Sequence, residues 1–382
     1  MAHTPRRGLV TRTMRDSPRT IQPQRLKQLL HRLIDIYSPS GKEEDILAFL
    51  HGYLKRHRVP VVRQPVDDHR YNLVVMPPET DTRLALMGHL DTIGAYDLDH
   101  YGYEEQDDLV IGLGAADMKG GCAAMVEAYL TLWECGSLRP PAALALVVGE
   151  EEEGDGAEQL VKDFDFPWAI IGEPTNLKPC LGSFGYLEVQ ICTTGKRRHP
   201  SLANMKRNPI ESMLRLILQI TRYMERERSE AVYNVRDLFS SQVGFAVPDR
   251  CEAWLDIHLP PASPIGEIVV ELEEIFTSES KEDPDLDATL RFPTIDAGYE
   301  LPAKGPVVEI LNTIFSKRSL PWEPQAFRSH SDANQLFEAG VLPFLLGPGR
   351  LQDAHAPDES VSFQQVCLAA ELYLDLLVSL SS

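Results

Sequence analysis

Residues 84–92 read LALMGHLDT, a short apolar run that leads directly into glycine, histidine and aspartate. Similar apolar runs, each bounded by turn residues or charges, occur at 72–76, 142–148, 168–172 and 341–346. Continuously apolar runs of this length are typical of strands that are buried on both faces of a sheet. The runs therefore predict an α/β fold, and the polar motif at 88–92 lies where one of its strands ends.

Segments with helical periodicity lie around these strands. Apolar residues recur at helical spacing over 26–34 and 46–54, on either side of the turn Ser38-Pro39-Ser40-Gly41, and again over 119–134 and 362–380. These segments predict two helices that lead into the fold, one between its strands and one that closes the chain.

The middle of the chain has a different order of elements. The pattern predicts, in order, a strand at 184–193, a helix at 209–225, strands at 241–247 and 251–259, a helix near 265–277 and a strand near 288–293. This βαββαβ order is that of the ferredoxin-like motif, which is able to fold as an inserted domain. We therefore expect an inserted domain over 183–297 within a larger domain formed by 25–182 and 298–382.

The composition excludes several classes of partner. The 382 residues carry a formal net charge of −20, from 37 basic and 57 acidic side chains. So acidic a surface repels nucleic acids and anionic membranes, and no long basic run offsets the charge. No apolar stretch approaches the roughly 18 residues that a membrane span needs. We expect neither a nucleic-acid partner nor a membrane partner.

Cysteine usage and the N-terminal residues bear on the compartment. The six cysteines show no CxxC spacing, which favours reduced thiols in the cytoplasm over a disulfide framework or a thiolate zinc site. Residues 1–24 contain five arginines but lack the apolar core of a secretory signal. We interpret them as a flexible extension. A transit peptide is the alternative, although no amphipathic apolar face accompanies the arginines.

Oxygen and imidazole donors gather at the predicted strand ends or just beyond them. The motifs are GHLDT (88–92), GLGAADMKGG (112–121), VVGEEEEGDG (147–156), IGEPT (171–175) and GPG (347–349) with AHAPDE (354–359). Each has a simple structural alternative, because a lone HxD can be incidental and a run of glutamates can be a solvated loop. The glycine-rich loop does not fit phosphate binding, since it lacks both GxxxxGK[ST] and GxGxxG.

Together the motifs predict a site for two metal ions. Open α/β sheets bind ligands at the carboxyl ends of their strands, which is where two histidines and at least three carboxylates are expected to meet. A histidine and a carboxylate on each ion, with one carboxylate shared, is a known two-metal arrangement. Nitrogen and oxygen ligands without thiolates suit Zn²⁺, Co²⁺ or Mn²⁺, and Zn²⁺ is the default expectation.

The order of these motifs resembles that of the co-catalytic zinc metallopeptidases and deacylases, which include acetylornithine deacetylase, succinyl-diaminopimelate desuccinylase, aminoacylase and glutamate carboxypeptidase. The resemblance covers nearly the whole chain from about residue 25. It implies a metallopeptidase-type αβα catalytic domain, in which the inserted ferredoxin-like domain serves as a lid and mediates dimerisation. It also implies two divalent ions, Zn²⁺ or Co²⁺ in its place, and a homodimer.

The resemblance assigns roles at the metal site. The ligands that it implies are His89 and Glu173 for one ion, Glu151 and His355 for the other, and Asp117 as the bridge between them. Asp91 would orient His89, and Glu150 would be the general base. A one-residue slip among the four glutamates would instead make Glu151 the base and Glu152 the ligand.

Residues outside the metal site are implied to bind substrate. In the lid, His199 and Asn208 match the family's histidine and asparagine, and such a histidine often reaches a neighbouring active site; a solvated loop is the simpler alternative. Asp256-Ile257-His258 departs from the Asp-x-Arg that relatives commonly show. Arg328 and Arg350 are therefore the candidates to bind a substrate carboxylate through paired hydrogen bonds.

We expect a metal-dependent amidohydrolase that removes an acyl group, in the first instance acetyl, from a small N-acyl amino acid such as N-acetylornithine. A di- or carboxypeptidase acting on short peptides is the alternative, because both reactions use the same ions and base and differ in pocket shape. A non-catalytic binding protein on this fold would lack a ligand or the base, whereas every such position is filled here.

Overall fold

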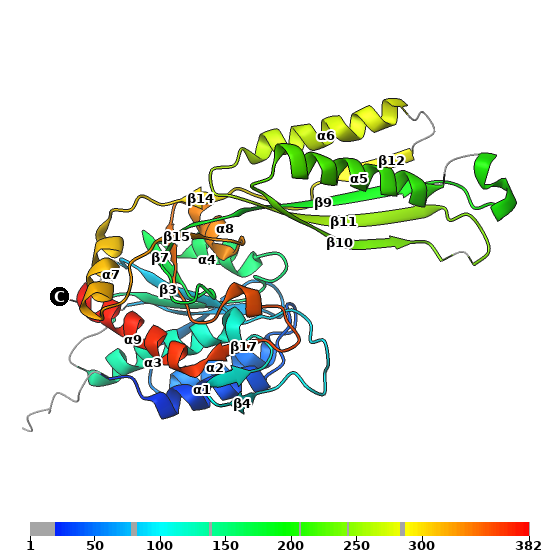
Figure 1. The fold of residues 1–382 in the computed structure, drawn as a ribbon. Coiled ribbons are helices and arrows are strands. Elements are labelled where there is room, and N and C mark those ends of the chain that lie inside the picture. Colours follow the sequence, from blue (N-terminus) through cyan, green and yellow to red (C-terminus); the bar gives the residue numbers. More distant parts are fainter. Residues whose placement is uncertain are drawn as a thin grey trace, which may run out of the picture.

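The computed structural model describes residues 20–77, 82–136, 140–205, 208–242, 244–282 and 287–381. Within these ranges the strands form a nine-stranded, a five-stranded and a three-stranded sheet. Figure 1 shows the first at the centre of the main body and the second in an arm that extends from it. Residues 1–19 of the predicted N-terminal extension lie outside the described residues, and helix α1 (Pro23–Asp35) begins shortly after them.

The central sheet is built from the apolar runs. Its described strands are, in spatial order, β1 (Val61–Pro65), β2 (Tyr71–Val75), β6 (Ala143–Val147), β3 (Ala85–His89), β7 (Trp168–Ile171), β16 (Leu342–Leu345), β8 (Cys180–Ser183) and β14 (Tyr299–Glu300), with β15 (Gln325–Phe327) paired to β8. Strand β3 is parallel to β6 and to β7, and β7 is parallel to β16. Every residue of β3, β6 and β7 is buried, which confirms the prediction of core strands.

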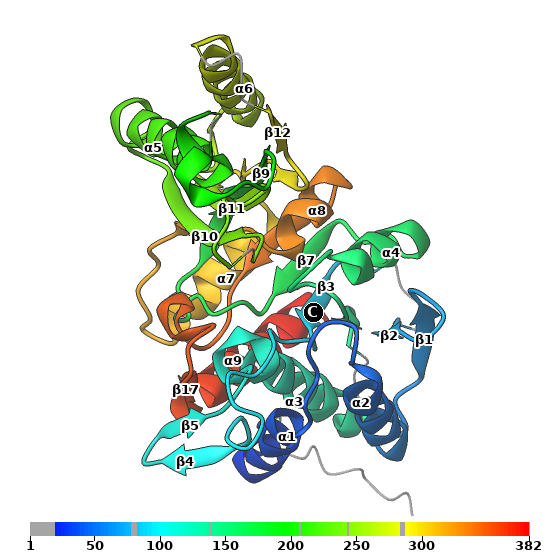
Figure 2. The same cartoon turned by 90° about the vertical axis from the view of Figure 1, so that its right-hand side faces the viewer.

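Helices cover both faces of this sheet. Helices α1, α2 (Glu44–Arg56), α3 (Gly120–Cys135) and α9 (Phe363–Leu380) lie on one side, and α4 (Asp155–Asp163) and α8 (Asp332–Glu338) lie on the other (Figures 1 and 2). Helix α7 (Pro306–Lys317) packs against α9. The predicted αβα class is confirmed, and the four helices expected from periodicity are α1, α2, α3 and α9.

Helix α9 is the last element of the core. Among the described residues it is the one helix that could span a membrane by length and composition alone. The sequence predicts this helix over 362–380, where Glu371 and Asp375 interrupt the apolar residues. It packs along α3, and Tyr373, Leu376 and Leu377 are fully buried. These contacts identify α9 as a core helix of the main body.

The five-stranded sheet and two helices form the arm. Its elements are β9 (Gly185–Thr194), α5 (Pro209–Glu227), β10 (Val232–Ser240), β11 (Arg250–Leu259), α6 (Ile265–Glu282), β12 (Asp287–Arg291) and β13 (Ile295–Asp296). The main strands lie in the order β10-β11-β9-β12, with α5 and α6 on one face (Figure 1). This is the ferredoxin-like arrangement that the sequence predicts, and Leu187, Leu216 and Leu255 belong to a core of its own.

One predicted strand of the arm is wrong. The apolar run at 241–247 is a loop in its described residues, and the strand before β11 is β10, at Val232–Ser240. Gly244 has a left-handed φ of 57°, which interrupts an extended backbone, and the neighbouring Phe245 is 98% exposed. Strand β10 pairs with β11 from Val232 to Ser240, so cross-strand pairing rather than local hydrophobicity decides where the strand lies.

The chain crosses between the body and the arm at two places, next to Phe184 and Ala297. The side-chain amide of Asn334 on α8 donates hydrogen bonds to the carbonyl oxygens of Phe184 (2.9 Å) and Ala297 (2.8 Å). One side chain of the main body therefore holds both crossings. The domain boundaries expected at 182/183 and 297/298 lie beside these crossings and stay predictions.

Candidate metal centre

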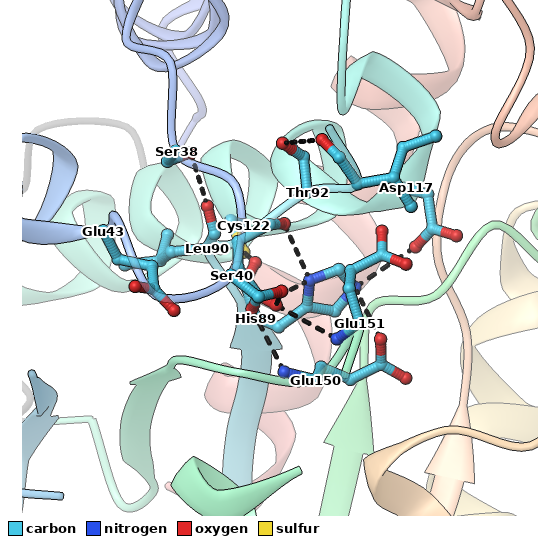
Figure 3. Close-up of polar contacts among 12 residues, drawn as sticks. Ser38, Ser40, Glu43, His89, Leu90, Thr92, Asp117, Cys122, Glu150 and Glu151 are labelled. Atoms are coloured by element: carbon cyan, nitrogen blue, oxygen red, sulfur yellow. Dashed lines mark hydrogen bonds and ion pairs between the residues drawn. The ribbon is translucent and has the colours of Figure 1, made fainter. Parts of the chain in front are cut away.

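Polar side chains follow three neighbouring strands of the central sheet. His89 is the last residue of β3, Glu150 and Glu151 come shortly after β6, and Glu173 comes shortly after β7. Because β3 is parallel to both β6 and β7, the three strands end at the same edge. Figure 3 shows the side chains of His89, Glu150 and Glu151 close together at this edge.

Two further segments bring donors to the same place. Asp117 lies in a π-helical turn, Ala115–Lys119, directly before α3, and its peptide bond to Met118 is cis. His355 lies in the loop between β16 and β17 (Ser360–Ser362). The structure thus brings all five predicted metal ligands together with Glu150.

His89, Asp117 and Glu173 form the first group of donors. Their ligand atoms lie within 4.8 Å of one another, and Nε2 of His89 is 3.2 Å from Oδ1 of Asp117. Oε1 of Glu173 is buried and has no hydrogen-bond partner. Because an unpaired buried carboxylate oxygen is costly, this atom fits the role of a metal ligand.

Asp117, Glu151 and His355 form the second group, again with ligand atoms within 4.8 Å of one another. Nε2 of His355 is 2.8 Å from Oε2 of Glu151 and 3.7 Å from Oδ2 of Asp117. Asp117 therefore belongs to both groups and presents a different oxygen to the histidine of each. A carboxylate that bridges two ions has this arrangement.

The glutamate run divides into a half that faces the site and a half that faces solvent. Oε2 of Glu150 lies 3.7 Å from Nε2 of His89, and His89, Glu150 and Glu151 make a third group of possible ligands. Glu152 and Glu153 are exposed. The geometry therefore favours Glu150 as base and Glu151 as ligand over the register that is shifted by one residue.

Asp91 supports the site in two ways. Nδ1 of His89 is 3.1 Å from the backbone oxygen of Asp91 and 3.6 Å from its carboxylate Oδ1. The carboxylate accepts hydrogen bonds from the Ser40 hydroxyl (2.7 Å) and from the backbone N–H groups of Glu150 (3.2 Å) and Glu151 (3.0 Å). Asp91 thus contacts the imidazole and also holds the turn that carries the glutamates, and its role in orienting His89 stays a prediction.

The site brings several carboxylates together in a largely buried position. Burial raises the pKa of Glu150, Glu151 and Glu173, and neighbouring carboxylates add to the rise. Burial alone would lower the pKa of His89, but Glu150 and the adjoining aspartates raise it well above its ordinary value. The hydrogen bond to Glu151 raises the pKa of His355 to about 9. Divalent cations would displace the protons that these groups retain, so the residues fit a pair of such ions.

Two further buried acids, to which the sequence assigns no role, lie near these ligands. Asp332, at the start of α8, has a carboxylate oxygen without a hydrogen-bond partner, and its charge contributes to the raised pKa of Glu150 and Glu173. Glu359 accepts backbone hydrogen bonds from the segment that carries Asp117. Glu359 lies in the motif at 354–359, but the burial of the two acids is visible only in the structure.

The two residues of the arm that were expected to bind substrate lie away from these ligands. His199 is exposed, and its Nδ1 is 2.8 Å from the hydroxyl of Ser201. Asn208 caps α5, where its side-chain oxygen accepts a hydrogen bond from the N–H of Ile210 at 3.0 Å. Within one described chain, neither side chain joins the groups that share Asp117, and their substrate role stays a prediction.

The two arginines proposed to bind a substrate carboxylate are both exposed. The guanidinium of Arg328 lies 6.0 Å from the centre of the Phe184 ring. Arg350 makes two hydrogen bonds to Asp353, at 2.6 and 2.9 Å, and its backbone forms a bridge with Thr175, close to Glu173. Their role toward substrate also stays a prediction.

Comparisons with known proteins agree on one family. The family model described as peptidase family M20/M25/M40 matches residues 85–379. Acetylornithine deacetylase of Edwardsiella ictaluri is 28% identical over 341 residues, which cover 84% of this chain and 86% of that protein.

Solved structures share the fold. A tripeptidase from Staphylococcus aureus superposes with a TM-score of 0.80 at 20% identity, covering 95% of this chain and 99% of that one. A dinuclear metal-binding peptidase of the M20 family from Bacillus subtilis gives a TM-score of 0.64 at 11% identity, covering 94% and 98% of the two chains. At these identities the similarity concerns the fold alone.

Proposed function

The chain belongs to peptidase family M20/M25/M40, and from this membership we propose that it removes an acyl group, in the first instance acetyl, from a small N-acyl amino acid such as N-acetylornithine. Membership makes the protein an amide or peptide hydrolase. The acyl substrate is supported by the similarity to an acetylornithine deacetylase, which extends over 84% of the chain.

The observation that carries the proposal is the pair of donor groups that share Asp117. Such a pair fits two divalent ions, with His89 and Glu173 on one and Glu151 and His355 on the other. We propose Zn²⁺, which Co²⁺ would be able to replace. When bound, the ions would supply Lewis acidity that polarises the amide carbonyl and stabilises the charge developing on its oxygen.

Glu150 has the position of a general base. It stands beside His89 and belongs to neither of the two groups that share Asp117, although it forms the third group with His89 and Glu151. We propose that its carboxylate faces substrate and water. Glu150 would take a proton from the attacking water and deliver it to the nitrogen of the leaving amine. Burial raises its pKa above the ordinary value of a glutamate, which is the direction that helps a carboxylate to hold the proton that it later returns.

A di- or carboxypeptidase is the alternative function. The tripeptidase of the same fold supports it, and the same donors and base would serve a peptide bond as well as an N-acyl bond. A non-catalytic binding role is disfavoured, because each proposed ligand position and the base carry a competent side chain. We propose a cytoplasmic enzyme without a nucleic-acid or membrane partner, in keeping with the net charge of −20 and the free cysteines.

We also propose that two copies pair through the arm. Strand β10 is an edge strand of the five-stranded sheet. Its Leu238 and Phe239, and Leu214 and Leu218 on α5, are between 45% and 53% exposed. An edge strand with exposed apolar side chains is a template for pairing with a second copy. In such a dimer, the exposed His199 would be available to the neighbouring subunit's site.

A turnover screen tests the substrate class. The Zn²⁺-loaded and Co²⁺-loaded protein is assayed with N-acetylornithine, N-acetyl-lysine, N-succinyl-diaminopimelate and a panel of dipeptides. We expect release of the acyl group from the N-acetyl amino acids. Hydrolysis of dipeptides alone would establish the peptidase alternative, and no turnover with metal bound would contradict both functions.

Substitution of single glutamates tests the mechanism. We expect Glu150→Gln to lower kcat by about 10²–10⁴-fold, because the base is lost, while both ions remain bound. Glu152→Gln is the matched control at an exposed position of the same run and should leave activity and metal content unchanged. Steady-state kinetics and metal analysis of both variants decide the register. Loss of an ion in Glu152→Gln would establish the shifted register instead.

A further inference from the structure

We propose that Glu359 is a positioning residue, which holds the loop of Asp117 at the distance from His355 that a pair of ions requires. The inference rests on the two-ion site of the proposed function. Glu359 is 2% exposed, follows His355 in the same loop, and belongs to none of the metal-ligand groups formed by the described residues. Its carboxylate therefore acts on the site through other residues.

The carboxylate of Glu359 accepts backbone hydrogen bonds from one distant loop. Oε1 accepts from the N–H groups of Ala116 and Asp117, both at 2.9 Å, and Oε2 accepts from the N–H of Gly114 at 2.9 Å. The backbone carbonyl of Glu359 accepts a further bond from the N–H of Gly112 at 3.0 Å. The segment that presents Asp117 is thus held at several points by one residue. We name the three bonds to the carboxylate the Glu359 clamp; the bond to the backbone carbonyl does not depend on the side chain.

The loop of Asp117 depends on the carboxylate of Glu359 because the N–H groups of this loop are buried. Asp117 and Met118 have non-helical φ and ψ angles within Ala115–Lys119, so a regular helix does not supply partners for the N–H groups of Ala116 and Asp117. Ala116 is fully buried and Asp117 is nearly so, which leaves little access for water. Without Glu359 these donors would be unpaired, and the loop would have to move to satisfy them.

The Glu359 clamp connects the two halves of the site. Oδ2 of Asp117 lies 3.7 Å from Nε2 of His355. From His355 the chain passes through Glu359 into β17, which pairs with β5 (Leu109–Ile111), the strand that precedes the loop of Asp117. The two segments are therefore joined twice, by strand pairing and by the clamp. Removal of the clamp would free the Asp117 loop while the strand pairing remains.

Metal titration and amide exchange of Glu359 variants test the clamp. Glu359→Ala removes both carboxylate oxygens, and Glu359→Gln keeps one oxygen and presents an NH₂ group in place of the other. We expect Zn²⁺ affinity, measured by dialysis against buffered free Zn²⁺, to fall about 10–100-fold in Glu359→Ala and less in Glu359→Gln. In metal-free protein, hydrogen exchange at the N–H groups of Gly114, Ala116 and Asp117 should accelerate, more in Glu359→Ala than in Glu359→Gln. Asp358→Ala, at the exposed neighbouring acid, is the matched control and should behave as wild type.

The possible outcomes distinguish a failure of the Glu359 clamp from a failure of the two-ion site. If wild type binds two Zn²⁺ ions and both Glu359 variants bind two with unchanged affinity, the clamp is wrong and the proposed function stands. If wild type binds fewer than two ions, the two-ion site and the clamp fail together. Circular dichroism checks that each variant is folded. Should Glu359→Ala not fold, the affinity and the exchange rates of Glu359→Gln decide in the same way.

Discussion

Glu150 and Glu151 are neighbours in the sequence, yet they face different histidines. Glu151 contacts His355 at 2.8 Å, whereas Glu150 lies 3.7 Å from Nε2 of His89. Asp91 holds both of their backbone N–H groups, so the orientation of the turn sets the role of each glutamate. The proposed roles of ligand, base and support thus differ by the groups that surround each carboxylate, and the residue type alone does not distinguish them.

His330 carries a pH dependence of stability. It stacks on Tyr186, with ring centroids 4.1 Å apart and planes at 6°, where α8 meets the arm. Burial, with a smaller contribution from His258, lowers the pKa of His330 to about 3. The unfolded chain takes up this proton below about pH 6.5, and the folded chain does not. The stability that His330 contributes is therefore complete above that pH and is lost as the pH falls toward 3, by at most ~1.4 kcal/mol per pH unit.

Thermal unfolding between pH 7 and pH 4 measures this effect. We expect His330→Phe, which keeps an aromatic ring on Tyr186 but cannot bind a proton, to show a flatter dependence of Tm on pH than wild type. His31→Phe is the matched control, since His31 also stacks on a tyrosine, Tyr103, but is half exposed. Equal slopes for wild type and His330→Phe would contradict the assignment.

The start of helix α3 lies unusually close to the strand that precedes Glu173. A Cβ atom on Gly121 would lie 2.3 Å from the carbonyl oxygen of Gly172, which is backbone and cannot move aside as a side chain could. Helix α3 thus packs directly on the residue before a proposed metal ligand. Helix α3 begins directly after the turn that carries Asp117, and β7 leads into Glu173. The close approach of α3 to β7 therefore helps to place Glu173 beside Asp117.

The substitution Gly121→Ala tests this contact between elements. We expect it to force α3 away from β7, to lower the free energy of unfolding by ~1–3 kcal/mol and to weaken Zn²⁺ binding. Gly52→Ala makes the same change inside α2, where the nearest atom is a side-chain nitrogen of Arg56 at 3.7 Å, and should stabilise by ~0.5–1 kcal/mol. Denaturant unfolding and metal titration of both variants provide the measurement. Equal effects of the two changes would show that the close approach does not matter.

The arm extends from the main body and presents strand β10 as a long edge that the described residues do not cover (Figures 1 and 2). Asn334 holds both crossings, so the base of the arm is attached to the body through α8. An arm tied at its base and open along β10 is suited to contact a second copy. The net charge of −20 is also a property of the whole molecule, and it disfavours binding to polyanions.

Solution mass of arm variants tests the homodimer. We expect wild type to run as two chains in size-exclusion chromatography with light scattering, and Leu238→Lys combined with Leu218→Glu to run as one chain, because both substitutions place charges in the proposed apolar interface. Val62→Glu is the matched control, an exposed apolar residue on β1 at the edge of the central sheet. A wild type that remains a single chain over the working concentration range contradicts the dimer.

The sequence predicted most of the main body and part of the arm. The runs that become β2, β3, β6, β7 and β16 could be identified because strands buried on both faces are apolar at every position. Strand β10 could not, because it is exposed along much of its length and its position depends on pairing with β11. Helix α4 and helix α8 were missed because both are short and therefore show too few turns for a periodic pattern.

The sequence by itself determined the class of fold, the order of the donors along the chain and the kind of chemistry that they support. Burial of apolar runs and the position of acids at strand ends are local properties, and a linear sequence displays them. Only the tertiary structure decided that Asp117 stands between His89 and His355, and that Glu359 holds the loop of Asp117. Both facts rest on contacts between segments that are far apart in the chain. Such contacts leave no local pattern in the sequence, because the packing of the folded chain decides which segments meet.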